Sequence, residues 1–126
     1  MTDLDFAEET LATLQERHPR FHRYAYAFLL DALHTVIGGM RETRHISGEE
    51  LVHGVRDLAM ERYGPLARTV LEYWGIHSTE DLGEVVFALV EIGILVKQDE
   101  DSPEDFEGLF DFVEVFDRNY PWTAAS

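Results

Sequence analysis

The chain has 126 residues, of which 45% are hydrophobic, and this composition indicates one packed domain and excludes a disordered chain. It contains no cysteine, which excludes disulfides, thiolate metal sites and cysteine nucleophiles. A formal net charge of −15 repels phosphate backbones and argues against direct binding of nucleic acid.

Two helices are predicted in the N-terminal third of the chain. The first runs from about residue 3 to residue 17 and ends before Pro19, because proline disfavours the helical conformation of the residue that precedes it. The second begins at residue 20 or 21, carries apolar side chains at steps of three and four, and stops at Gly38 and Gly39.

Three further helices are predicted in the middle of the chain. A capping box of the pattern S-x-x-E at residues 47–50 precedes the third helix. The Gly-Pro pair at residues 64–65 ends the third helix and starts the fourth, which closes at Gly75. The fifth helix follows a cap at residue 78 or 79 and runs to Gly93.

A strand pair is predicted after the helices. Residues 94–97 and 112–116 are short runs rich in β-branched or aromatic side chains, and they favour an antiparallel hairpin. Between them, Ser102 and Pro103 predict the cap and first position of one short helix. Residues 76–77 supply a third short strand.

This order of helices and strands is typical of a winged helix. The predicted fold class is therefore mainly α (α+β), a five-helix domain with a C-terminal β-hairpin and a winged-helix-like architecture. The single domain is predicted over residues 1–117, with N-terminal helices over about 3–40 and the winged-helix-like part over about 44–117. Residues 118–126 form a loose tail.

The charge distribution argues against DNA as the partner of such a domain. Residues 78–93, which replace the usual recognition helix, contain four acidic side chains and no basic one. Positioning on a duplex requires several phosphate contacts from arginine or lysine. Residues 61–126 hold fifteen acidic and four basic side chains, whereas residues 1–60 hold ten and six.

The one basic stretch is a candidate anion-contact patch. Arg17, Arg20 and Arg23 recur every three residues and lie among aromatic residues. In one interpretation the patch contacts RNA or another anion, and the protein is a nucleic-acid-associated factor. In the other, these arginines balance the chain's own acids, as charge clusters on protein surfaces usually do.

No metal, cofactor or catalytic site is predicted. His18 and His22 have the spacing that lets two imidazoles share one ion, but Pro19 disfavours a helical His18. The acidic run from Asp99 lacks the glycine and glutamate of an EF-hand loop, and three of the four serines have capping roles. A small enzyme or ligand-binding domain stays open as a third alternative, and it requires a pocket lined by convergent polar groups.

The segment over residues 99–117 mixes nine acidic side chains with apolar ones. Either its apolar side chains only pack onto the helices, or the segment is a docking surface with acids that attract a basic partner and an aromatic anchor. The candidate contact residues are Asp99, Glu100, Asp101, Glu104, Asp105, Phe106 and Phe110.

The favoured function is a non-catalytic protein-interaction module with a basic protein partner. Self-association into a homo-oligomer is a variant of this hypothesis. An adaptation of the whole chain to a salt-rich cell interior would also explain its acidity.

Three segments of the chain also resemble a known group of proteins. They are residues 45–51 (HISGEEL), 63–75 (YGPLARTVLEYWG) and 80–87 (EDLGEVVF). They resemble a family of uncharacterised bacterial proteins associated with planctomycetes, verrucomicrobia and related lineages. That family has no assigned activity, so the resemblance implies a bacterial, cytoplasmic setting and transfers no functional residues. An acidic N-terminus and the lack of a membrane-length apolar run also predict a cytoplasmic protein without a membrane partner.

Overall fold

The computed structural model describes residues 2–41, 46–95 and 102–118, and side chains over residues 9–41, 46–95 and 102–117. The described part is mainly helical, and its five α-helices are α1 (Thr2–Arg17), α2 (Arg23–Gly38), α3 (Gly48–Tyr63), α4 (Ala67–Tyr73) and α5 (Thr79–Glu91). Two short 3₁₀-helices, η1 (Gly64–Leu66) and η2 (Pro103–Phe106), and the π-helix η3 (Val113–Arg118) complete it.

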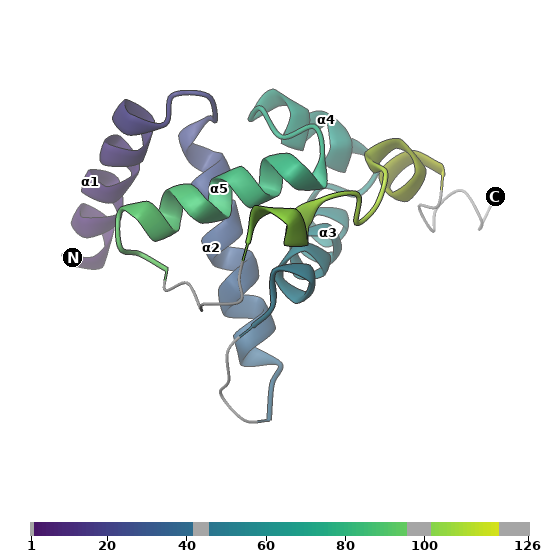
Figure 1. Ribbon diagram of the computed structural model, residues 1–126, viewed down its shortest axis with the longest axis horizontal. Helices are drawn as coiled ribbons and strands as arrows, with labels where there is room; N and C mark the ends of the chain where they lie inside the picture. The colour runs from purple at the N-terminus through teal and green to yellow at the C-terminus, as the bar shows by residue number, and fades with distance from the viewer. Residues whose placement is uncertain (1, 42–45, 96–101, 119–126) are drawn as a thin grey trace.

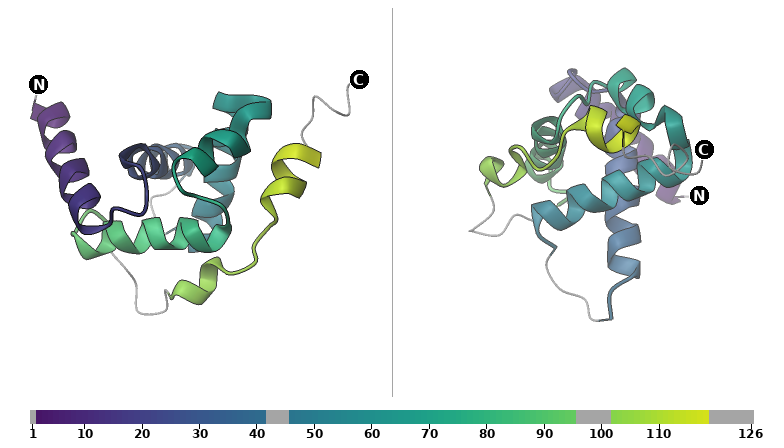
Figure 2. Two further views of the ribbon diagram at one scale, coloured as in Figure 1. Left: turned by 90° about the horizontal axis from the view of Figure 1, so that it is seen from above. Right: turned by 90° about the vertical axis from the view of Figure 1, so that its right-hand side faces the viewer.

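The helices enclose one hydrophobic core. α5 runs across α2, with α1 at one end of the molecule and η3 at the other (Figures 1 and 2). Trp74, which follows α4, packs against aromatic rings of α2 and α3. Its ring centroid lies 5.4 Å from that of Phe28 and 5.9 Å from that of Tyr63. Each aromatic side chain buried in this way contributes roughly 1.5–3 kcal/mol, and the cluster ties α2, α3 and α4 together.

The predicted caps of α3 and α5 are confirmed. The backbone N–H of Glu50 donates to Ser47 Oγ at 3.1 Å, and the Ser47 N–H donates to Glu50 Oε1 at 3.1 Å. Ser78 Oγ accepts a hydrogen bond from the Asp81 N–H at 3.2 Å. Both contacts satisfy backbone donors that have no partner inside the helix, so they fix where each helix begins.

The start of α2 differs from the prediction by two or three residues. Its N-cap is His22, whose Nδ1 accepts a hydrogen bond from the backbone N–H of Tyr24 at 3.1 Å. Phe21 stays outside the helix, where its side chain is buried. Because His22 caps α2 and Phe21 is buried outside it, the connection between α1 and α2 is longer than predicted and α2 is shorter.

The predicted strands at residues 76–77 and 94–97 are wrong where the structure describes them. Ile76 and Ile94 instead close the helices that precede them: the Ile76 N–H donates to Leu71 O and the Ile94 N–H donates to Leu89 O, both at 2.9 Å. Each follows a glycine in the left-handed region, with φ of 96° at Gly75 and 87° at Gly93. This is the geometry of a helix C-terminal cap, and it uses the backbone donors that a strand would need. Residues 96–97 lie outside the described ranges.

The predicted strand at residues 112–116 is also wrong, because this segment leads into the π-helix η3. Phe112 and Phe116 are both buried, and their ring centroids lie 5.2 Å apart at 90°. A strand would bring Glu114 onto the same face as these two rings, whereas a helical backbone leaves Glu114 exposed. Burial of the ring pair overrides the β-propensity of the valines, so the described residues contain no hairpin and do not support a winged helix.

The acidic part of the chain packs against two of the helices. The ring of Phe106 in η2 lies between Gly48 of α3 and Gly83 of α5. A Cβ atom added to Gly48 would lie 2.7 Å from Phe106 Cζ, and one added to Gly83 would lie 2.7 Å from Phe106 Cγ. Phe106 is consequently only 3% exposed, and it anchors the segment after residue 101 to the helical body. Of the predicted tail at residues 118–126, Arg118 is the last residue of η3, and residues 119–126 lie outside the described ranges.

Replacing Gly75 by alanine is expected to destabilise the protein by about 1–3 kcal/mol. The substitution places a side chain at a φ of 96° and a Cβ atom 2.9 Å from the backbone oxygen of Arg20. Gly38→Ala is the matched control, because an added Cβ there meets nothing within 4 Å. Urea denaturation of both variants measures the difference. Equal stabilities would show that the α4–α5 connection does not need this close approach.

Candidate functional site

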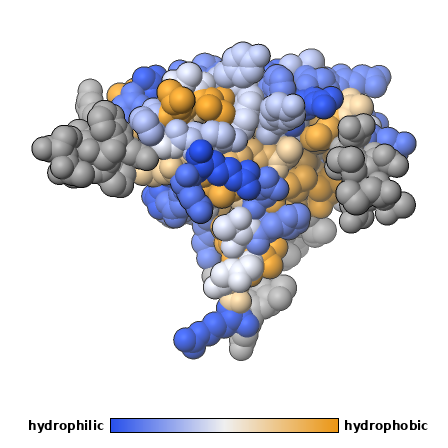
Figure 3. Space-filling view, turned by 180° about the vertical axis from the view of Figure 1, so that it is seen from behind, coloured by the Kyte–Doolittle hydropathy of each residue, from blue (hydrophilic) through white to orange (hydrophobic). Residues whose placement is uncertain are grey.

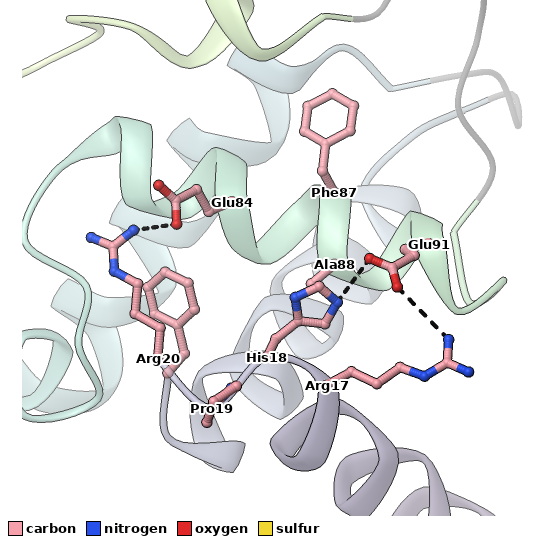
Figure 4. A pocket seen from close by; sticks show the side chains of 9 residues that line it. Arg17, His18, Pro19, Arg20, Glu84, Phe87, Ala88 and Glu91 are labelled. Carbon is pink, nitrogen blue, oxygen red and sulfur yellow. Dashed lines mark hydrogen bonds and ion pairs between the residues drawn. The ribbon is translucent and has the colours of Figure 1, made fainter.

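A pocket lies between the α1–α2 connection and α5. Its volume is about 450 Å³, and its lining comes from residues 17–21 on one side and from Glu84, Phe87, Ala88 and Glu91 on the other. Figure 4 shows the two glutamates on α5 facing the basic side chains of the connection. Glu84 and Glu91 are seven residues apart, so they lie on one face of the helix about two turns from each other.

Three hydrogen bonds position the backbone of the connection. The Tyr26 hydroxyl donates to His18 O at 2.8 Å, and Gln15 Nε2 donates to Phe21 O at 3.1 Å. The His22 N–H donates to Trp74 O at 2.9 Å. α1, α2 and the end of α4 each supply one partner. Hydrogen bonds to its backbone therefore fix the position of the connection, in addition to the side-chain contacts that it makes with α5.

One end of the pocket is closed by Arg20. Its guanidinium donates to Asp81 Oδ1 at 2.5 Å and to Glu84 Oε2, and it lies 4.9 Å from the ring centroid of Phe21. The hydrogen bond to Glu84 is the largest of the interactions that raise the pKa of Arg20 above its ordinary value. Two carboxylates of α5 therefore compensate the charge of this guanidinium.

The buried carboxylate of Asp81 is the other half of this contact. Asp81 is 6% exposed, and its second oxygen, Oδ2, accepts a hydrogen bond from the His77 N–H at 2.8 Å. It also lies in the first turn of α5, where the helix dipole favours a negative charge. The charge is thus compensated from three sides, as a buried carboxylate requires.

The opposite end of the pocket is more loosely held. Arg17 Nη1 lies 3.7 Å from Glu91 Oε1, and both side chains are more than half exposed. His18 Nε2 lies 3.0 Å from Glu91 Oε2, but this contact lacks hydrogen-bond geometry, and the buried nitrogen has no hydrogen-bond partner among the described residues. Arg17 and Glu91 are therefore only loosely paired with each other at this end, and both stay exposed to solvent.

The structure does not join the three arginines of the predicted anion-contact patch into one basic surface. Arg17 faces Glu91, and Arg20 faces Asp81 and Glu84. Arg23 lies over the ring of Tyr24, with 5.8 Å between its Cζ atom and the ring centroid. Two of the three arginines face acids of α5. This arrangement agrees with the interpretation that the arginines balance the chain's own acids.

The two histidines with metal-ligand spacing in the sequence have different surroundings in the structure. His18 lines the pocket, whereas His22 caps α2 and lies 4.8 Å from Tyr24 and 5.9 Å from Tyr73 between ring centroids. Within the described ranges no group of three histidine, aspartate or glutamate side chains is arranged to hold a metal ion. The pocket presents charges and apolar surface, which suit binding.

The second candidate site is the acidic segment, defined here as residues 102–117. Of the predicted contact residues, Glu104 and Asp105 are exposed and Phe106 is buried between two glycines. Phe110 is partly buried against Phe116, with 6.1 Å between their ring centroids. The remaining predicted contacts, Asp99, Glu100 and Asp101, lie outside the described ranges. The aromatic side chains of the segment thus face the helices and its carboxylates face water.

The carboxylates of the acidic segment have few partners. Its exposed acidic residues are Glu104, Asp105, Glu107, Asp111 and Glu114, and none of them forms an ion pair with a basic side chain in the described ranges. Asp117 is the exception, since its Oδ2 lies 2.6 Å from Arg68 Nη2. The pKa of Glu104 is lowered because its carboxylate accepts hydrogen bonds from its own backbone N–H and from Ser102. The segment is therefore a surface of uncompensated negative charge.

Exposed apolar side chains form a third surface feature. Figure 3 shows the face opposite to that of Figure 1, where hydrophobic groups lie among hydrophilic ones. Tyr73 is 77% exposed, Leu66 61% and Tyr24 52%. These side chains come from η1, from the end of α4 and from the start of α2. No described residue covers them, and their exposure alone does not define a ligand.

Sequence reasoning missed the α5 side of the pocket. Glu84, Phe87 and Glu91 were expected only as parts of an acidic amphipathic helix, and Glu84 and Glu91 face the basic stretch at residues 17–20. The opposite charges of the two segments were visible in the sequence. Their proximity was not, because 61 or more residues separate each pair along the chain and only the tertiary packing brings them together.

Comparisons with known proteins supply no relative. No protein-family model, no curated protein and no solved structure matches this chain. The resemblance to the bacterial family therefore stays a prediction. Within the described ranges, no helix is both long enough and apolar enough to cross a membrane.

Asp81→Asn is expected to lower the free energy of unfolding by about 1–2 kcal/mol, because it weakens charge-assisted hydrogen bonds while Arg20 stays half exposed to water. A double-mutant cycle with Arg20→Gln should give a coupling of about 1 kcal/mol. The exposed pair formed by Asp31 and Arg62 is the matched control, with an expected coupling below about 0.5 kcal/mol. Similar couplings in both cycles would contradict a special role for Asp81.

Stability is expected to fall between pH 10 and pH 12 because of Tyr26. Burial raises the pKa of Tyr26 to about 12, whereas a tyrosine in the unfolded chain titrates near pH 10. The stability that the neutral hydroxyl contributes is thus complete below pH 10 and is lost as the pH rises towards 12, by up to about 3 kcal/mol. Urea denaturation across this range measures the loss. Tyr26→Phe should lower stability by about 1 kcal/mol at neutral pH and reduce the alkaline loss; an unchanged pH profile would contradict the assignment.

Proposed function

We propose that this protein is a non-catalytic interaction module whose acidic segment, residues 102–117, binds a basic region of another protein. The observation that carries the proposal is the opposite orientation of the two kinds of side chain in this segment. Phe106, Phe112 and Phe116 are at most 5% exposed, whereas the five carboxylates that have no basic partner among the described residues all face water. The segment is ordered by its phenylalanines, and its charges are free to act outwards.

Order matters for such a surface because it reduces the entropy lost on binding. In a disordered acidic tail the chain must be ordered when the partner arrives, whereas here the helical body already holds the backbone. Leu109 contributes to this order, since its N–H donates to Thr79 Oγ1 at 3.2 Å. The carboxylates are thus presented in a fixed pattern, which supports selection among basic partners as well as attraction of them.

A basic protein fits this surface better than nucleic acid or a second copy of the chain. Phosphate backbones carry the same sign of charge as the acidic segment, and two copies meeting through it would bring like charges together. The nucleic-acid alternative depends on Arg17, Arg20 and Arg23, and the first two of these face carboxylates of α5. The proposal therefore commits to a partner with clustered lysine or arginine side chains.

The test compares two triple variants with the same net charge. Glu104→Gln/Glu107→Gln/Glu114→Gln removes three charges from the acidic segment, and Glu9→Gln/Glu16→Gln/Glu61→Gln removes three exposed charges elsewhere. Binding of a fluorescent decalysine peptide, measured by anisotropy over a range of salt concentrations, should weaken by about fivefold or more in the first variant. The second variant should stay within about twofold of the unmodified protein.

The matched net charge makes the result decisive. An equal loss of affinity in both variants would show that the peptide responds to overall charge and would overturn the proposed surface. Folding stability that climbs steeply with molar potassium chloride would favour adaptation of the whole chain to salt. Circular dichroism of both variants checks that the helical body is unchanged.

A further inference from the structure

The pocket between the α1–α2 connection and α5 has one end that is closed and one that is open to a ligand. At the closed end Arg20 is occupied by two carboxylates. At the open end Arg17 and Glu91 are more than half exposed and lie 3.7 Å apart, too far for a direct hydrogen bond. A small molecule can therefore bind between Arg17 and Glu91 without breaking a direct hydrogen bond between these two side chains.

The open end carries a third polar group, which faces Glu91. His18 Nε2 lies 3.0 Å from Glu91 Oε2 and is shielded from solvent. In Figure 4 the imidazole lies between the two ends of the pocket and points towards Glu91. His18 therefore orients the Glu91 carboxylate, while the side chains of Arg17 and Glu91 stay more than half exposed.

We propose that this pocket binds a small zwitterion with an apolar body, of the chemical class of an apolar α-amino acid. The ligand's carboxylate pairs with Arg17, its ammonium group pairs with Glu91, which His18 orients, and its apolar side chain lies against Phe21, Phe87 and Ala88. This inference uses none of the residues of the acidic segment and is independent of the proposed function.

The charges of the pocket select this class over singly charged ligands. A carboxylate alone would gain Arg17 but would be repelled by Glu91, and an amine alone would meet the reverse situation. Because Arg17 Nη1 and Glu91 Oε1 are only 3.7 Å apart, the two charges of the ligand must also lie close together. An α-amino acid meets this requirement, since one carbon atom carries both groups.

The experiment is an NMR titration of the ¹⁵N-labelled full chain with four probes. L-phenylalanine and L-leucine represent the zwitterions, and 3-phenylpropionate and phenethylamine carry the same aromatic body with one charge each. Saturable shifts are expected for the amides of residues 17–21 and 84–91 with at least one of the amino acids. The affinity for each single-charge probe should be about fivefold or more lower than that for phenylalanine, or for leucine if phenylalanine is the weaker amino acid.

Two variants locate the binding, and a third controls for loss of surface charge. Arg17→Gln and Glu91→Gln should each weaken amino-acid binding by about fivefold, a modest factor because both side chains are half exposed. Arg62→Gln, which removes another exposed ion-paired arginine, should leave binding within about twofold. Circular dichroism confirms that each variant is folded.

Three results would overturn the proposal. The first is an absence of shifts with both amino acids up to their solubility. The second is a phenethylamine or phenylpropionate affinity equal to that of the tighter amino acid, which would show that one charge suffices. The third is amino-acid binding that neither Arg17→Gln nor Glu91→Gln weakens. None of these outcomes depends on the decalysine test, so the two proposals fail separately.

Discussion

The buried carboxylate of Asp81 is the interaction on which the arrangement of the helices depends. A charge that is 6% exposed must be compensated within the protein, and Arg20 and the backbone of His77 provide that compensation. These partners belong to the α1–α2 and α4–α5 connections, so one side chain joins two loops at the start of α5. Gly75 makes the junction sterically feasible, because any Cβ atom at that position would crowd the backbone oxygen of Arg20.

The first turn of α5 extends this role to the acidic segment. Thr79 is fully buried, and its hydroxyl accepts the hydrogen bond from Leu109 in the acidic segment. Asp81 and Thr79, in one turn of α5, thus bind the α1–α2 connection and the acidic segment, respectively. Both proposed binding surfaces are attached to the same helix, although they use different side chains.

The sequence predicts the helices well because their ends depend on local chemistry. The capping box at Ser47 and the breaks at Gly75 and Gly93 involve residues that are close along the chain. The strand predictions are wrong because a short run of β-branched and aromatic residues indicates burial of the segment and does not determine its backbone conformation. A short apolar run can be buried in a helical or an extended backbone, and the pairing of Phe112 with Phe116 is decided by tertiary contacts.

The distribution of arginines explains which acids are available to a partner. On α5, the carboxylates of Asp81, Glu84 and Glu91 face Arg17 at the end of α1 and Arg20 in the α1–α2 connection, so part of the charge of this acidic helix is compensated within the fold. In the acidic segment only Asp117 has such a partner among the described residues, in Arg68. Within the described ranges, the negative charge of the C-terminal half is thus partly compensated on α5 and has no basic partner on residues 102–114. That difference, which net charge alone does not reveal, locates the attraction for a basic partner on the segment rather than on the helix.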